Sequence, residues 1–518
     1  MKKSLYFFPF LLALVSITSC SCSEVVDPIK EVVVEKTKMN YTYQDYMGNY
    51  NTTSNAIPNQ GEPEILIIPV YFSDSSYFIP EDKKEVVRSD IQKSFAGTKE
   101  DCGFESVASY YSTLSVNKCN LKCNVAEWLS VDRSYEEYAR SEEITLTLVK
   151  EVTNTYFTQS GEDRTKYDLD KNGFLDGVVV IYGAPDYQSL DTKDSNLWAY
   201  TTWDLYAKAD VENPVLCNYF WASYTFMYTQ AVANTKLSGA EFIYGRGDDS
   251  KGHALLDTHI YIHEMGHMFG LPDYYDYSYQ FCPAGGFSMQ DYNVASHDPF
   301  STIALGWCEP FIPTETCKIT LNTFQSSREC ILLTNTWNSI NSPFDEYLLL
   351  EFYSPDGLNQ FDHENQYFAN NRSQRRPVGS DECGIRLWHV DARLLSTPYS
   401  KNPSNITVDP KAQGKVMHAM SNTYFDSTRG RNYISPLGRD YANYNILQLI
   451  RNEDTQTYKT NTSFDKHSLF KDGSTFSMNA FSKQFVNKSR LNSDIVLGWN
   501  FEVHIEGNQA KITLLRTL

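Results

Sequence analysis

The chain has 518 residues and a mass of 59.3 kDa, which is too long for one ordinary domain, and 41% of its residues are hydrophobic. Two or three globular units with packed cores are therefore expected. The formal net charge is -19 and the sequence contains no basic patch, which argues against nucleic acid as the main partner.

The N-terminus has the pattern of an export signal. Two lysines precede an apolar run over residues 5–17 that is too short to span a membrane. The ending Ile-Thr-Ser-Cys resembles the lipobox of bacterial lipoproteins, which implies a signal peptide over residues 1–19 and a lipid anchor at Cys20. The alternative is an ordinary secretory leader cleaved nearby. We therefore expect an exported protein, either a membrane-anchored lipoprotein in the periplasm or on the cell surface, or a secreted one.

Residues 20–62 are polar, rich in Asn, Thr and Tyr, and show little periodicity. This composition predicts a lipid-anchored tether or a short pro-segment. Nine cysteines follow Cys22, and Cys119 and Cys123 have no matching Cys/His pair downstream for a structural zinc site. Export permits disulfides, but an odd number leaves one thiol without an intrachain partner unless Cys22 takes part. The connectivity stays open.

Residues 63–310 alternate between strand and helix patterns. The apolar runs at 64–72 and 177–183 predict strands that are buried on both faces. Apolar side chains recur at helical spacing in 87–95 and 142–157, which predicts amphipathic helices. This alternation predicts an α/β unit.

The stretch YDLDKNGFLDG resembles a calcium-binding loop. Its oxygen-bearing side chains fall at loop positions 1, 3, 5 and 9: Asp168, Asp170, Asn172 and Asp176. Gly173 stands at the tight-turn position 6, whereas Val179 replaces the usual glutamate at position 12. The loop thus has fewer negative charges than a full calcium-binding loop, which implies weaker calcium binding. The sequence leaves two alternatives open, a calcium site and a solvated turn.

Residues 258–270 predict a helix that ends at Gly270. On this helix His263 and His267 lie one turn apart, so both imidazoles can bind one zinc ion. Glu264 follows the first histidine directly and points toward a water molecule on the metal rather than toward the metal. A hydrolytic zinc site has this arrangement.

The residues around the predicted helix end favour a return of the chain toward the histidines. Gly266 costs about 1 kcal/mol relative to Ala inside a helix, which suggests that another group approaches the backbone there. Gly270 lets the chain turn, and Pro272 prevents the helix from continuing. Asp273 is thereby directed back toward the two histidines.

The stretch HEMGHMFGLPDYYD resembles the active-site signature HExxHxxGLPDxYD of the immune inhibitor A-like family of secreted bacterial metallopeptidases, which belong with the metzincin-like zinc peptidases. The resemblance implies Asp273 as the third zinc ligand in place of the usual histidine, and a carboxylate oxygen is a normal zinc ligand. The similarity spans roughly residues 62–400. It implies a metzincin-like peptidase domain over residues 63–310 and also covers the calcium-type loop.

Residues 285–307 are similar to the family's next block, in which a Met-containing turn lies beneath the metal. The resemblance implies a packing role for Met289 rather than a ligand role. His297 is a candidate for contact with substrate or metal, although most lone histidines are structural. His259 could fall on the same helix face, but Ile260 rather than a glutamate follows it, so the later pair is preferred.

Residues 311–518 carry short β-prone segments separated by clusters of Gly, Asn, Asp and Ser. This pattern predicts a mainly β C-terminal domain with long irregular insertions around 355–383 and 400–440. The expected fold is therefore an α/β (α+β) peptidase domain followed by a β-rich domain.

These features together predict a zinc-dependent endopeptidase that hydrolyses peptide bonds of extracellular proteins. Zinc would activate a water molecule, and Glu264 would take its proton as general base and pass it to the leaving amine. A first rival takes the third ligand from a later helix, with Glu309 as the candidate. A second rival, of a different class, is a surface-exposed binding lipoprotein with a catalytically degenerate peptidase scaffold. The expected partners are protein or peptide substrates and, through Cys20, a membrane.

Overall fold

The computed structural model describes most of the chain from residue 33 onward. The described residues are 33–50, 55–102, 104–138, 140–186, 196–228, 256–277, 280–364, 376–396, 407–408, 416–418, 420–423, 444–453 and 462–518. The predicted signal peptide and Cys20 lie outside these ranges. Within them, no helix combines the length and apolarity needed to cross a bilayer.

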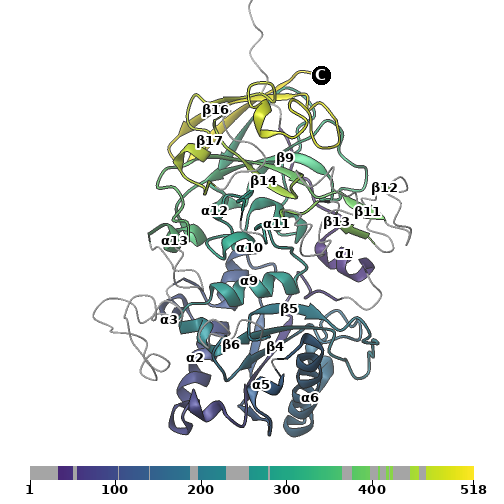
Figure 1. Ribbon diagram of the computed structural model, residues 1–518. Helices are drawn as coiled ribbons and strands as arrows, with labels where there is room; N and C mark the ends of the chain where they lie inside the picture. The colour runs from purple at the N-terminus through teal and green to yellow at the C-terminus, as the bar shows by residue number, and fades with distance from the viewer. Residues whose placement is uncertain are drawn as a thin grey trace, which may run out of the picture.

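A mostly parallel sheet forms the lower half of the molecule (Figure 1). Its strands are β1 (Glu64–Tyr71), β2 (Lys122–Val125), β3 (Leu129–Ser130), β4 (Gly177–Tyr182), β5 (Tyr200–Trp203) and β6 (Asn218–Ser223). The order is β2-β1-β4-β6-β5, with β3 also beside β1, and β5 alone runs antiparallel to its neighbour. The predicted strands at 64–72 and 177–183 are confirmed as β1 and β4, and both are buried along nearly their whole length.

Helices cover both faces of this sheet. One face carries α2 (Lys84–Ala96), α4 (Val107–Leu114) and α9 (His259–Met268), and the other carries α5 (Tyr135–Tyr138) and α6 (Glu142–Ser160). Successive side chains of β1 point to opposite faces of the sheet, so both faces are apolar. Ile65 and Ile67 pack in the cluster with α2, α4 and α9, whereas Leu66 and Ile68 pack in the cluster with α5 and α6. The shorter helices are α3 (Lys99–Cys102), α10 (Met289–Tyr292), α11 (Pro299–Ala304), α12 (Phe324–Ser327) and α13 (Gln360–Glu364).

The second half of the chain is β-rich, as predicted. One antiparallel sheet has the order β14-β10-β9-β8, formed by β8 (Cys330–Leu333), β9 (Glu346–Tyr353), β10 (Gly384–Asp391) and β14 (Leu447–Ile450). A second has the order β15-β16-β17-β7, formed by β7 (Cys317–Asn322), β15 (Thr475–Phe476), β16 (Trp499–Glu506) and β17 (Gln509–Arg516). A small sheet joins β11 (Leu394–Ser396), β12 (Thr407–Val408) and β13 (Val416–His418). The fold is therefore a mixed α+β fold.

The two halves share one hydrophobic core. On one face of β9, Leu348 and Leu350 pack against the second β sheet. On the other face, Leu349 joins the cluster that contains Tyr261 of α9 and Phe300 of α11. The fold therefore changes from α/β to mainly β near residue 310, but the residues before and after this point share a hydrophobic cluster.

The N-terminal segment packs into this core, which corrects part of the sequence prediction. Helix α1 (Tyr43–Tyr50) buries Tyr43 completely, and Met47 is only 8% exposed. Farther along, the backbone N–H of Ile57 donates to the Met268 carbonyl at the end of α9, at 3.0 Å. Residues 39–47 and 55–59 are therefore not a solvated tether. Their apolar side chains pack against parts of the chain that are distant in sequence, and local composition does not reveal such contacts.

Candidate metal centre

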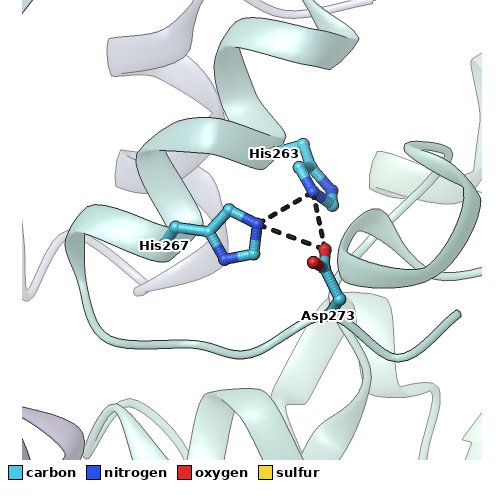
Figure 2. Close-up of side chains that lie close together, drawn as sticks. All are labelled: His263, His267 and Asp273. Atoms are coloured by element: carbon cyan, nitrogen blue, oxygen red, sulfur yellow. Dashed lines mark hydrogen bonds and ion pairs between the residues drawn. The ribbon is translucent and has the colours of Figure 1, made fainter. Parts of the chain in front are cut away.

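Helix α9 and the turn after it bring together the three residues that the sequence singled out as zinc ligands. Figure 2 shows His263 and His267 projecting from the helix toward Asp273. The two Nε2 atoms are 3.1 Å apart, and Asp273 Oδ1 lies 3.1 Å from His263 Nε2 and 3.2 Å from His267 Nε2. Donor atoms bound to one tetrahedral zinc ion at about 2.0–2.1 Å lie roughly 3.3 Å from one another. The spacing of this donor triangle therefore suits one metal ion.

Hydrogen bonds behind the histidines orient their lone pairs toward the centre of the triangle. His263 Nδ1 donates to the Met289 carbonyl at 2.8 Å, and His267 Nδ1 donates to the Leu271 carbonyl at 2.7 Å. Because a carbonyl oxygen can only accept, both protons lie on Nδ1 and both Nε2 atoms offer a lone pair. Asp273 Oδ1 is buried and has no hydrogen-bond donor among the described residues. Three acceptors that face one another at this spacing repel unless a cation lies between them, so the residues fit a metal ion.

The electrostatics of the triangle also favour positive charge. Burial works to lower the pKa of His267, but the Asp273 carboxylate outweighs it and raises that pKa to about 9. Conversely, burial works to raise the pKa of Asp273, but His267 and His263 hold it well below its usual range. Both shifts have the same cause, because the Asp273 carboxylate and the positively charged form of His267 stabilise each other.

Gly266 leaves room for the amide of Gln290, which confirms that another group approaches the helix backbone there. A Cβ added at Gly266 would overlap Gln290 Oε1. That oxygen accepts from His297 Nε2 at 3.1 Å, and His297 Nδ1 pairs with the Tyr110 hydroxyl at 2.8 Å. With both ring nitrogens engaged and no exposed surface, His297 has a structural place outside the donor triangle. Burial also holds its pKa well below the usual value, so the imidazole is neutral.

The turn that returns Asp273 depends on Gly270 and on helix α1. Gly270 has φ +99°, a conformation that residues with a side chain rarely adopt. A Cβ added there would lie 2.9 Å from Met47 Cγ and 3.2 Å from Tyr43 Cβ, because α1 packs directly behind the turn. The N-terminal segment thus supports the connection between the second and third donor residues.

Glu264 lies beside the triangle without belonging to it. Its side chain is almost fully buried, and Oε2 lies 3.2 Å from the hydroxyl of Thr201 on β5. The same hydroxyl contacts the Glu264 carbonyl at 2.9 Å, so strand β5 is tied to α9 at this residue. Burial raises the pKa of Glu264 above its usual value, because the charged carboxylate loses contact with water.

The remaining sequence candidates fall outside the triangle. His259 is held between Asp257, at 2.8 Å from Nδ1, and Asp362, at 3.0 Å from Nε2, so it belongs to a buried structural ion cluster. Met289 is fully buried and meets the site through its carbonyl, in keeping with a packing role. Among the described residues, the group of donor atoms within 4.8 Å of one another includes Asp273 and not Glu309.

The calcium-type loop forms a second group of carboxylates. Oxygens of Asp168, Asp170 and Asp176 lie within 4.8 Å of one another. Gly173 has φ +85°, as its tight-turn position predicts. Asn172 lies beside this group: its Oδ1 accepts from the Phe174 N–H at 2.9 Å, and its amide donates to Asn55 Oδ1 at 2.8 Å and to Asp170 Oδ2 at 3.0 Å.

Several residues with polar contacts at the metal site escaped the sequence interpretation: Tyr110, Thr201, Tyr277 and Gln290. Tyr110 and Thr201 lie far along the chain from the signature, and no spacing in the sequence links either residue to the histidines. Gln290 had an indirect signal in Gly266, whose missing side chain marks the space that the amide occupies. Tyr277 stands directly after the signature and was given no role.

Comparisons with known proteins add little to this description. The chain matches no protein-family model and no curated protein. Two solved structures of wild type OgpA from Akkermansia muciniphila, in different crystal forms, are similar at 9% and 10% sequence identity. The alignments cover 70% of this chain and 91% and 92% of those chains, with TM-scores of 0.20 and 0.17. Similarity at this level assigns neither a fold nor a function.

We predict that Gly266→Ala lowers the melting temperature by a few degrees. An alanine would ordinarily favour the helix by about 1 kcal/mol, but displacing the Gln290 side chain from its packed site costs roughly 1–3 kcal/mol. Gly48→Ala in α1 is the matched control, because nothing lies within 4 Å of the added Cβ. Thermal unfolding measures both variants, and a Gly266→Ala protein as stable as Gly48→Ala would contradict the packing argument.

Proposed function

We propose that the chain is a zinc-dependent endopeptidase that hydrolyses peptide bonds of extracellular proteins. The donor triangle of His263, His267 and Asp273, with Glu264 beside it, carries this proposal. Two neutral imidazoles and one carboxylate are a usual protein ligand set for catalytic zinc, which keeps a further position open. The signature around these residues supports an immune inhibitor A-like, metzincin-like peptidase domain over residues 63–310.

The side chains around the site have separate tasks in this reaction. Zinc, when bound, supplies Lewis acidity that makes a water molecule more acidic and polarises a carbonyl group. Glu264 takes a proton from the attacking water and delivers it to the leaving amine. Thr201 donates to Glu264 Oε2 at 3.2 Å and so restrains the carboxylate of the general base.

Strand β5 supports the view that the substrate is an extended polypeptide. It lies at the edge of the sheet, and among the described residues β6 is its one strand partner. Thr201 of this strand contacts Glu264, so a peptide paired with the free edge of β5 would pass close to the general base. An extended chain that enters and leaves along such an edge can be cut internally.

We also propose that the protein is exported and carries a lipid anchor at Cys20.

We further propose that the loop at Asp168, Asp170 and Asp176 binds a calcium ion. Three carboxylates crowded at one turn suit a hard cation with oxygen ligands. Burial, followed by the neighbouring Asp170 and Asp168 charges, raises the pKa of Asp176 to about 8. A bound cation would offset the repulsion between these carboxylate charges.

Glu264→Ala is expected to slow hydrolysis strongly while zinc stays bound, because this side chain moves the proton and is not one of the three ligands. Loss of the acid-base step should slow casein cleavage by about 10²–10⁴-fold. Zinc content measured on the same preparation is the control for an intact site. Undiminished casein cleavage by the variant would refute the assigned role.

Asp273→Ala is expected to reduce zinc binding to well below one ion per chain, because the triangle loses its only negatively charged donor. Glu309→Ala, which removes the rival third ligand, should keep the wild-type zinc content. Metal analysis after dialysis measures both variants. If Asp273→Ala keeps its zinc and Glu309→Ala loses it, the rival ligand set is the right one.

The loop predicts a calcium-dependent response of stability to pH. Because the folded pKa of Asp176, about 8, lies above its ordinary value of 3.8, the folded state holds a proton that the unfolded chain has lost. With calcium chelated, stability therefore falls as pH rises from about 4 to 8. Added calcium should raise the melting temperature more at pH 8 than at pH 5, and Asp176→Asn should lose this difference. An equal response of variant and wild type would count against a calcium site here.

A further inference from the structure

The segment after the third donor residue contains a tyrosine whose hydroxyl reaches the metal site. Tyr277 donates a hydrogen bond of 2.6 Å to Asp273 Oδ2 (the other oxygen of that carboxylate faces the histidines). Its side chain is 38% exposed at the rim of the site, whereas Asp273 is largely buried. Packing alone does not require a hydroxyl at such a rim position.

The two oxygens of Asp273 therefore have different environments. Oδ1 is buried, lacks a hydrogen-bond donor among the described residues and lies 3.1–3.2 Å from both Nε2 atoms. Oδ2 is already engaged by a neutral donor, Tyr277. A carboxylate with both oxygens free can bind a metal through one oxygen or through both, and it can rotate between these modes. The hydrogen bond from Tyr277 restrains Oδ2 and so favours binding through Oδ1.

The chain around Tyr277 is itself held in place. Asp276, directly before Tyr277, accepts hydrogen bonds from the N–H groups of Gln280 and Phe281, at 3.1 and 3.2 Å. On the other side, the Tyr275 ring lies 5.2 Å from the Tyr277 ring and 6.3 Å from the His263 ring, measured between centroids. The hydroxyl is thus directed at Asp273 by a fixed local structure.

The Asp273 end of the segment is anchored to the β half of the chain. Asn422 donates from its amide to the Tyr274 carbonyl and to the Leu447 carbonyl on β14, both at 2.7 Å. The Tyr274 N–H in turn donates to the Gln290 carbonyl at 2.8 Å. The backbone of Tyr274, directly after Asp273, is therefore restrained through both its N–H and its carbonyl, and Tyr277 adds the restraint on the carboxylate itself.

We propose that Tyr277 is a positioning residue that restricts Asp273 to binding metal through Oδ1 alone. This inference rests on the proposed zinc site. By occupying Oδ2, the tyrosine keeps the carboxylate from taking a second coordination position, which stays open for water and substrate. Supporting hydrogen bonds of this kind typically change metal affinity by about 10–100-fold.

Tyr277→Phe in the full chain tests the proposal, because it removes the hydroxyl and keeps the ring. Zinc affinity is measured by competition with a chelating dye, and ligation is measured by the visible absorption of the cobalt-substituted protein. We expect zinc affinity to fall by about 10–100-fold. The cobalt absorption should weaken, because a carboxylate that binds through both oxygens raises the coordination number. Tyr77→Phe, at an 84% exposed site, is the matched control and should resemble wild type in both measurements.

The outcomes separate this inference from the proposed function. If wild type binds neither zinc nor cobalt, both are overturned. If wild type binds both ions and Tyr277→Phe shows the same zinc affinity and the same cobalt spectrum, the positioning role is overturned and the zinc site stands. Weaker zinc binding together with an altered cobalt spectrum, at an unchanged melting temperature, supports the role of Tyr277.

Discussion

Electrostatic repulsion between three lone-pair donors is the constraint on which the site depends. His263, His267 and Asp273 present two Nε2 atoms and one carboxylate oxygen 3.1–3.2 Å apart, with both Nδ1 protons directed at backbone carbonyls. Without a cation or an added proton, this arrangement is unfavourable. The fold around the donors therefore has to hold them together by packing and backbone hydrogen bonds, and a positive ion bound between them would remove the repulsion.

That support comes from distant parts of the chain. Helix α1 packs behind Gly270, and Ile57 bonds the end of α9 to the N-terminal segment. From the β half, Arg386 donates to the Phe287 carbonyl at 3.1 Å, just before the segment whose carbonyl orients His263. The β half and the N-terminal segment thus form part of the scaffold of the site, which explains why one hydrophobic cluster runs through both halves of the molecule.

The sequence predicted those features whose information is local. Strands β1 and β4 follow from unbroken apolar runs, and the approach of His263 to His267 follows from one helical turn. Contacts that depend on tertiary structure were out of reach. Tyr43 and Met47 lie among polar neighbours, so their burial against Gly270 appears only when that turn is in place. Thr201 meets Glu264 because β5 forms the sheet edge beside α9, which no spacing in the sequence encodes.

X-ray absorption spectroscopy of the zinc-loaded protein tests the central claim most directly, because it reports the atoms around the ion. The account predicts one zinc per chain surrounded by nitrogen and oxygen at about 2.0–2.1 Å, with two imidazoles and no sulfur. The described part of the chain holds nine cysteines, so thiolate ligation is a real alternative for an adventitious ion. Sulfur neighbours at about 2.3 Å, or a protein that retains no zinc, would contradict the proposed site.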